Sequence, residues 1–310
     1  MRAILITALL ASLALAGCTG SDDTVRIAFV AKDTATAPAE DLDLLAAHLS
    51  DATGLDVSIH YFTSSTAALA ALKAGQADIA SVDGAAGWLA WTELGLEAFG
   101  SETRSDGRTH YMASAWVHAD SDIQTVADLA GKNSCHTGAT KSAGMFMPMG
   151  YLTQEGLIDW SGYPDDISQV QEGAKAFFDH AQIGGGIYDG YEGAFRCLSD
   201  GTGDVAFVRD TTPMDYCGDD ARDWCLDLAD YRELQQFGAV PEHPFMVGPH
   251  LSADNLDKIS AALFAMSDDE LLDAVFGTDA IVPVETAEHL GQYGGLLNLL
   301  PGGSGYAQSK

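Results

Sequence analysis

An alternation of strand and helix patterns runs along the chain from residue 25 and limits the folds open to it. The apolar run VRIAFVA is followed by a helical pattern over 39–53 and then by DVSIHYF, whose side chains alternate as in a strand. A capped helix ending near Gly75 and the strand pattern ADIASVDG continue this β-α-β order. Later strand patterns are YMASAWVHA, GDVAFVRD and HPFMVGP, and later helical patterns cover 143–155 and 256–276. The sequence therefore predicts an α/β fold with a parallel-sheet rhythm.

Length and charge restrict the function further. The 310 residues suffice for one large or two medium domains, and 47% apolar residues can build a full core, which excludes a disordered chain. A formal net charge of −30 argues against nucleic acid as a partner. With only seven lysines, the composition resembles the acidic surface of proteins from salt-rich habitats, where dense carboxylates stay hydrated and their repulsion is screened.

Residues 1–17 have the pattern of a secretory signal peptide, with one basic residue, an apolar stretch too short to span a membrane, and small residues before Cys18. The run LAGC at 15–18 resembles a bacterial lipobox, in which the cysteine becomes the lipidated first residue. Residues 18–24 would then form a tether. We therefore expect an exported protein, lipid-anchored at the cell surface or the periplasmic face of a membrane. An ordinary signal peptide with a chance cysteine is the alternative.

Apart from Cys18, the chain has an even number of cysteines, which in an exported protein suggests two disulfides. These cysteines are Cys135, Cys197, Cys217 and Cys225. Of the three possible pairings, a bond between Cys217 and Cys225 closes a short local loop and leaves the other two for each other. Free buried thiols are the alternative.

Polar residues follow several predicted strands at their carboxyl ends, where open α/β sheets bind ligands. Asp83, Thr137 and Arg209 occupy such positions. In the segment GKNSCHTGATKSAGMF, small residues and Lys141 precede a helix whose free N–H groups and dipole can hold an anion. The spacing differs from that of a P-loop. The pattern indicates an anion site, with a capped helix and a solvated lysine as the alternative.

Five blocks of the sequence, in order along the chain, resemble the transferrins. The blocks are ADIASVDGAAGWLA, HYMASAWVHADSD, SCHTGATKSAGMFMPMGYL, GYEGAFRCLSDGTGDVAFVRDTT and VPEHPFMV. The resemblance covers roughly residues 25–300 and corresponds to one lobe, where animal transferrins usually have two. It implies extracytoplasmic binding of ferric ion with a synergistic carbonate, for iron acquisition or transport, and no enzymatic activity. The fold it implies is a two-domain clamshell of the type II periplasmic-binding-protein type.

The resemblance also implies a metal-ligand set, carried over residue by residue. The implied ligands are Asp83, Tyr111, Tyr191 and His243. Two phenolates and a carboxylate neutralise the three charges of a ferric ion, and an imidazole completes four protein donors. A bidentate carbonate can supply the two remaining octahedral positions. Each of these residues alone is more commonly structural, so the hypothesis depends on their joint match.

Further positions of the family fall on the anion segment and the cysteines. The implied anion site consists of Thr137, Lys141 and the N–H groups of Ala143 and Gly144, with Lys141 where the family usually has arginine. The family disulfide between two of the blocks falls on Cys135 and Cys197. Cys225 matches a family cysteine whose usual partner is missing, so Cys217 is the expected replacement. Arg209 falls on one position of the family's acid-sensing lysine pair, near the metal ligands.

The alternative ligand is an oxyanion bound without metal. The segments ALAALKAGQADIA, DLAGK and FGTDAIVPV resemble phosphonate- and phosphate-type receptors of ABC importers. Here the helix start at 137–144 would bind the oxyanion directly. A sensor or scaffold without a ligand would not need all four metal-ligand positions filled.

Both ligand hypotheses predict the same two domains. Domain one is expected at 24–108 plus 245–306 and domain two at 112–240. Hinge strands are expected near 108–111 and 240–243. We expect a monomer with an ABC importer or another uptake receptor as partner.

Overall fold

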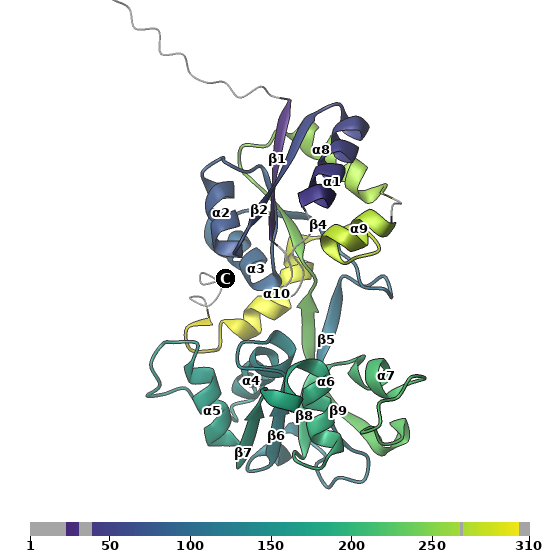
Figure 1. Cartoon of the computed structure of the whole chain (residues 1–310). Coiled ribbons are helices and arrows are strands. Elements are labelled where there is room, and N and C mark those ends of the chain that lie inside the picture. The colour runs from purple at the N-terminus through teal and green to yellow at the C-terminus, as the bar shows by residue number, and fades with distance from the viewer. Residues whose placement is uncertain (1–22, 31–38, 267–268, 304–310) are drawn as a thin grey trace, which may run out of the picture.

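The computed structural model describes residues 23–30, 39–266 and 269–303, which form two α/β domains, each around its own β-sheet (Figure 1). The predicted signal peptide and Cys18 lie outside the described residues, as does most of the predicted tether. Across the described ranges, no helix is both long and apolar enough to cross a bilayer.

The first domain contains a six-stranded sheet with the order β11-β4-β10-β3-β1-β2. Its strands are β1 (Thr24–Val30), β2 (Asp56–Phe62), β3 (Ile79–Ser81), β4 (Ala98–Glu102), β10 (Pro244–Val247) and β11 (Ile281–Pro283). Strand β1 pairs in parallel with β2 and β3, as the β-α-β pattern predicts, whereas β10 runs antiparallel between β3 and β4. The helices of this domain are α1 (Ala39–Thr53), α2 (Ser65–Lys73), α3 (Gly84–Leu94), α8 (Ala253–Phe264) and α9 (Asp269–Phe276).

The second domain contains a five-stranded sheet with the order β7-β6-β8-β5-β9. Its strands are β5 (His110–His118), β6 (Asn133–His136), β7 (His180–Ile183), β8 (Val205–Arg209) and β9 (Tyr231–Pro241). Its helices are η1 (Val126–Leu129), η2 (Ser142–Phe146), α4 (Met147–Gln154), α5 (Gln169–Phe177), η3 (Gly186–Tyr188), α6 (Gly190–Ser199), α7 (Thr212–Cys217) and η4 (Leu228–Asp230). Strands β6, β7 and β8 are parallel, and β5 runs antiparallel to β8 and β9.

The chain passes between the domains along two adjacent segments. One joins β4 to β5, and the other joins β9 to β10 through Glu242 and His243. Because β5 and β9 pair along their length, from His110 opposite Pro241 to His118 opposite Tyr231, these segments lie side by side. Both sheets are mixed because their connecting strands β5 and β10 enter antiparallel to their neighbours. Residues at the two connections are therefore held close to both domains.

Helix α10 (Thr286–Leu297) packs between the two domains (Figure 1). It contacts α3 in the first domain and α4 and β9 in the second. Glycines permit the close approach on both sides: a Cβ on Gly294 would overlap the Trp88 ring, and one on Gly150 would lie 2.7 Å from the Leu296 carbonyl oxygen.

Most, but not all, predicted elements form. Helix α1 has the predicted bounds, and α2 is capped by Ser64 and followed by Gly75 at φ +68°. The single helix predicted over 256–276 is wrong, because α8 ends at Phe264 and α9 begins at Asp269. The patterns also missed β9, because its burial does not alternate cleanly along the strand.

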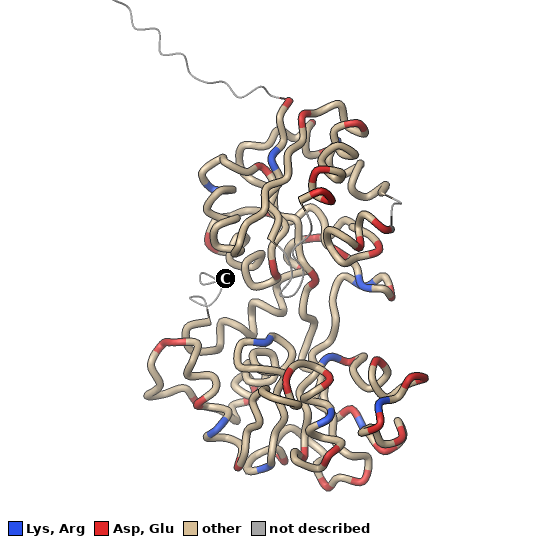
Figure 2. The backbone as a smooth tube through the Cα atoms, in the orientation of Figure 1, with Lys and Arg blue, Asp and Glu red and all other residues tan. Residues whose placement is uncertain are grey.

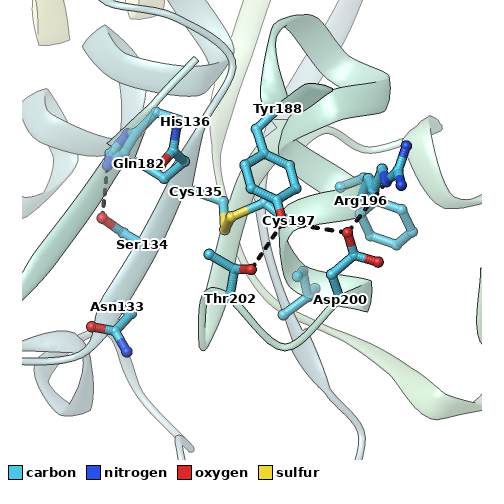
Figure 3. The surroundings of a disulfide bond; sticks show 12 residues. Asn133, Ser134, Cys135, His136, Gln182, Tyr188, Arg196, Cys197, Asp200 and Thr202 are labelled. Carbon is cyan, nitrogen blue, oxygen red and sulfur yellow. Dashed lines mark hydrogen bonds and ion pairs between the residues drawn. A yellow bond between two sulfur atoms is a disulfide. The ribbon is translucent and has the colours of Figure 1, made fainter. Parts of the chain in front are cut away.

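Both predicted disulfides form, Cys135 with Cys197 and Cys217 with Cys225. The first joins β6 to α6 (Figure 3). Acidic residues are spread over both domains, with basic residues few among them (Figure 2). The excess of acidic residues seen in the composition is therefore distributed along both domains rather than confined to one segment.

Candidate functional site

A cavity of about 750 Å³ lies between the domains and brings together residues that are far apart in the sequence. Seven of the residues predicted to form the site line it: Asp83, Tyr111, Thr137, Lys141, Tyr191, Arg209 and His243. Its walls come from both domains and from the connections between them, as in the ligand clefts of two-domain binding proteins.

Asp83 connects β3 to α3 and serves as the N-cap of that helix. Its Oδ1 accepts hydrogen bonds from the N–H groups of Ala85 at 3.0 Å and Ala86 at 3.1 Å. Its Oδ2 accepts a hydrogen bond from the Ser65 hydroxyl at 2.8 Å. The cap fixes the carboxylate in the cavity wall, where it offers lone pairs and negative charge.

Tyr111, near the start of β5, and Tyr191, near the start of α6, meet edge to face with ring centroids 6.4 Å apart. Their hydroxyls share a hydrogen bond. Burial, reinforced by the neighbouring Tyr191, raises the pKa of Tyr111 well above 10. Burial also raises the pKa of Tyr191, opposed by the hydrogen bond to Tyr111 and by the charge of Arg209. Both phenols are therefore protonated at neutral pH, and a metal that bound them would displace two protons.

Arg209 ends β8 and lies over the Tyr191 ring, 4.8 Å from its centroid. Its guanidinium is held by Asp215, with an Nη2 to Oδ2 distance of 2.9 Å. The cation thus stands beside Tyr191, where it favours the phenolate form.

His243 occupies the connection between β9 and β10, with its Nδ1 3.8 Å from Oε1 of the buried Glu102. The neighbouring Glu242 also lines the cavity and pairs with Arg104, whose Nη1 lies 3.1 Å from Oε1. Arg104 in turn lies 5.5 Å from the Tyr111 ring centroid. The ion pair of Arg104 and Glu242 therefore links the two connecting segments, next to the Tyr111 ring and to His243.

Thr137 follows β6 and has a buried hydroxyl, for which no hydrogen-bond partner is found among the residues the structure describes. It packs against Gly144 so closely that a Cβ there would lie only 1.9 Å from the Thr137 Oγ1. The Thr137 carbonyl accepts a hydrogen bond from the N–H of Gly190, the residue before Tyr191. A buried hydroxyl that lines a cavity without a protein partner is suited to a ligand.

Lys141 precedes the turn η2, which is a π-helical turn continuous with α4. Lys141 is exposed and lines the cavity together with Ser142, whose hydroxyl lies 3.0 Å from that of Tyr293 on α10. Ala143 and Gly144 are buried behind them, and the described cavity wall does not include them. Their N–H groups belong to the first helical turn, which has no acceptors within the helix.

Several lining residues were not singled out from the sequence. These are Thr63, Ser64, Ser65, Glu242 and Tyr293. The helix-capping pattern of SST located the start of α2 but not its exposure to a cavity. Glu242 adjoins His243 and could have been found from that position. Tyr293 had no local signal, because only the packing of α10 between the domains brings it here.

Three or more His, Cys, Asp or Glu side chains close enough to bind a metal are not found together within 23–30, 39–266 and 269–303. A metal in this cavity would therefore need the phenols as donors. The donor types present, phenol, carboxylate and imidazole, fit a hard cation of high charge.

Comparisons with known proteins find similarity of two kinds, to transferrins and to a family of periplasmic binding proteins. The chain shares 33% identity over 186 residues with ovotransferrin from Gallus gallus, which covers 51% of this chain and 26% of that protein. It shares 33% identity over 180 residues with serotransferrin from Bos taurus, covering 46% and 24% respectively. The matched region is thus about a quarter of the length of these relatives.

A family model described as the periplasmic substrate-binding protein of a phosphonate ABC transporter matches residues 27–290. That description implies a bound ligand and a transporter as partner, and both this family and the transferrins consist of binding proteins rather than enzymes. The clamshell of two α/β domains around a cavity is consistent with that family. The chain therefore belongs to the phosphonate-type periplasmic substrate-binding proteins of ABC transporters.

Proposed function

We propose that this protein binds ferric ion together with a carbonate-type anion in the cavity between its domains. Asp83, Tyr111, Tyr191 and His243 would supply the protein ligands of the ion. The observation that carries the proposal is that these four donors, from separate elements of the fold, line one cavity. The transferrin relatives support the same conclusion.

The anion would lie at the start of η2. Thr137 supports this through its buried hydroxyl, which has no hydrogen-bond partner among the described residues, and Lys141 would supply positive charge. The N–H groups of Ala143 and Gly144 would complete the site, since the first turn of a helix favours negative charge. Arg209, over the Tyr191 ring, would stabilise the phenolate.

A metal-free phosphonate or phosphate ligand is the second candidate, and the family model favours it. Thr137, Lys141 and Arg209 suit such an oxyanion as well as they suit carbonate. Asp83 carries a carboxylate and His243 an imidazole, both side chains that coordinate metal cations, and the carboxylate repels an anion. The side of the cavity that carries Asp83 and His243 is therefore the reason to prefer a ferric ion over a metal-free oxyanion as the ligand.

Ligand would close the two domains, with residues 108–111 and 240–243 acting as hinge strands. We infer that lipidation of Cys18 anchors the protein beside an uptake system, which the lipobox-like residues 15–18 support. Replacing Cys18 by alanine should move the exported protein from the membrane to the soluble fraction.

Visible absorbance tests the proposal, because phenolate ligands give ferric complexes a charge-transfer band. Ferric nitrilotriacetate with bicarbonate should colour the wild-type protein, and Tyr191→Phe should weaken or shift the band. Tyr151→Phe is the matched control, because Tyr151 lines a different pocket. A colourless wild-type protein that binds phosphate or a phosphonate tightly without metal would establish the second candidate instead.

A further inference from the structure

His136 is a buried titratable residue that the proposed ligand contacts do not use. It ends β6 with 0% exposure, directly before Thr137, and is packed between the rings of Phe178 and Phe207. Burial lowers its pKa to about 4, so the ring is neutral at physiological pH.

Both ring nitrogens of His136 have fixed roles. Its Nδ1 lies 2.7 Å from the Gly144 carbonyl oxygen, which can only accept, so Nδ1 carries the proton. In the neutral ring Nε2 is then an acceptor, and it takes a hydrogen bond from the Ser134 hydroxyl at 2.9 Å (Figure 3). The hydrogen bonds thus define one tautomer and one ring orientation.

The bond to Gly144 compensates for a gap in the helix. In an α-helix the carbonyl of residue 144 would accept from the N–H of residue 148, but Pro148 has no N–H. The chain forms the π-helical turn η2 at this point, and His136 supplies a donor from the neighbouring strand. A side chain of β6 thereby fixes the start of the helix.

This contact joins the two elements that carry the groups proposed to bind the anion. Thr137, one residue after His136, touches Gly144 so closely that only glycine fits there. The hydroxyl of Thr137 and the N–H groups of the helix start come from different elements, so their separation depends on how β6 and η2 are joined. The residue that precedes His136 on the same strand, Cys135, is joined to α6 by its disulfide with Cys197 (Figure 3).

We propose that His136 is a positioning residue for the oxyanion site, holding the start of η2 against Thr137 through the Gly144 carbonyl. This inference rests on the proposed function in one respect, because it requires that an oxyanion binds at this turn. Either carbonate or phosphate would meet that requirement. His136 itself does not touch the ligand.

Two substitutions test it. His136→Asn keeps a donor at the δ position, whereas His136→Leu keeps bulk and loses the donor. His118→Leu is the matched control, because His118 makes the same kind of contact away from the proposed site. It is the last residue of β5, whereas Tyr111 is near the first, and its Nε2 lies 2.9 Å from the Leu198 carbonyl oxygen of α6. Calorimetric titrations with phosphate and with bicarbonate, each with and without ferric nitrilotriacetate, give the oxyanion affinity of variants shown to be folded by circular dichroism.

We expect His136→Leu to lose about tenfold or more in oxyanion affinity, and His136→Asn and His118→Leu to stay within about threefold of wild type. Equal affinity of His136→Leu and wild type would overturn the inference, as would equal losses in the Asn and Leu variants. A protein that bound phosphate tightly without metal and stayed colourless with ferric nitrilotriacetate would refute the ferric proposal while still testing His136. A wild-type protein that bound neither anion under any condition would refute both.

Discussion

Replacing Asp83 separates its structural contribution from its proposed contribution to the metal site. Asp83→Ala removes the N-cap of α3, which typically costs about 0.5–2 kcal/mol. It also leaves the buried Ser65 hydroxyl without its acceptor, which costs about 1–3 kcal/mol more. We expect the free energy of unfolding to fall by about 2–4 kcal/mol. Asp83→Asn retains capping oxygen, so its cost should stay below about 1 kcal/mol.

Iron binding should be affected alike in the two variants, although their stabilities differ. Both lack the only negative charge that the body of the first domain contributes to the proposed ligand set, so both should bind ferric ion more weakly and close less. Both should remain coloured, because the band comes from the two phenolates. The assays are urea unfolding of the metal-free protein, the visible band, and small-angle scattering with and without ferric ion and bicarbonate.

Ser65→Ala is the matched control, since it removes the partner of Oδ2 but leaves the carboxylate and its helix cap. It should lose about 1 kcal/mol of stability and still close with iron. If Asp83→Asn closed and retained iron like wild type, Asp83 would be a helix cap only. If Asp83→Ala were as stable as wild type, the capping argument itself would be refuted.

Three further predictions concern charge, covalent bonds and pH. Lys141→Ala should weaken anion binding several-fold and raise the pH midpoint of iron release. Lys141→Arg should do the reverse, because a guanidinium can donate two parallel hydrogen bonds. Identical midpoints in all three proteins would show that Lys141 is a solvated side chain. Replacing Cys135 and Cys197 by serine opens a loop that spans 62 residues, and the free energy of unfolding in urea should fall by about 4 kcal/mol. Removing the other disulfide, which spans 8 residues, should lower it by about 2.5 kcal/mol. Equal losses would contradict the loop-entropy argument. Burial lowers the pKa of His136 from 6.5 to about 4, so the unfolded chain binds more protons than the folded one between these pH values. The free energy of unfolding of the metal-free protein should therefore fall by about 3 kcal/mol as the pH drops from 6.5 to 4. His136→Asn should lack this part of the loss, and parallel pH profiles of the two proteins would contradict the argument.

Local patterns predicted those parts of the fold in which neighbouring residues decide the structure. The apolar periodicity of α1 and the capping serine of α2 act over a few residues, so the bounds of both helices followed from the sequence. The division of 256–276 into two helices was missed, although Ser267 and Asp268 are residue types that start helices. Strand β9 depends on pairing with β5, which no local window contains.

The candidate site followed from the sequence by two different routes. Asp83, Thr137 and Arg209 were predicted from their places after strands, because strand ends of an α/β sheet share an edge, and all three line the cavity. Tyr111, Tyr191 and His243 followed only from the family resemblance, since a tyrosine in a strand or helix is usually a packing residue. Glu242 and Tyr293 needed the packing of the connecting segments and of α10.

The two candidate ligands make different demands on the two sides of one cavity. Carbonate beside iron and a metal-free phosphonate would both use Thr137 and Lys141, whereas only the metal uses Asp83 and His243. A variant at Asp83 therefore distinguishes the candidates, and a variant at Thr137 tests what they share.

Thr137→Ala should weaken the binding of either ligand with little cost to the fold. Its buried hydroxyl has no hydrogen-bond partner within the described part of the chain, so removing it relieves an unsatisfied group while the lost methyl removes packing. These effects oppose each other, and the free energy of unfolding should change by less than about 1 kcal/mol. Thr137→Ser is the control, because it keeps the hydroxyl and should keep most of the oxyanion affinity. Unfolding in urea and titration with bicarbonate and phosphate measure both quantities, and an alanine variant that lost stability but not affinity would show that Thr137 serves the fold and not the ligand.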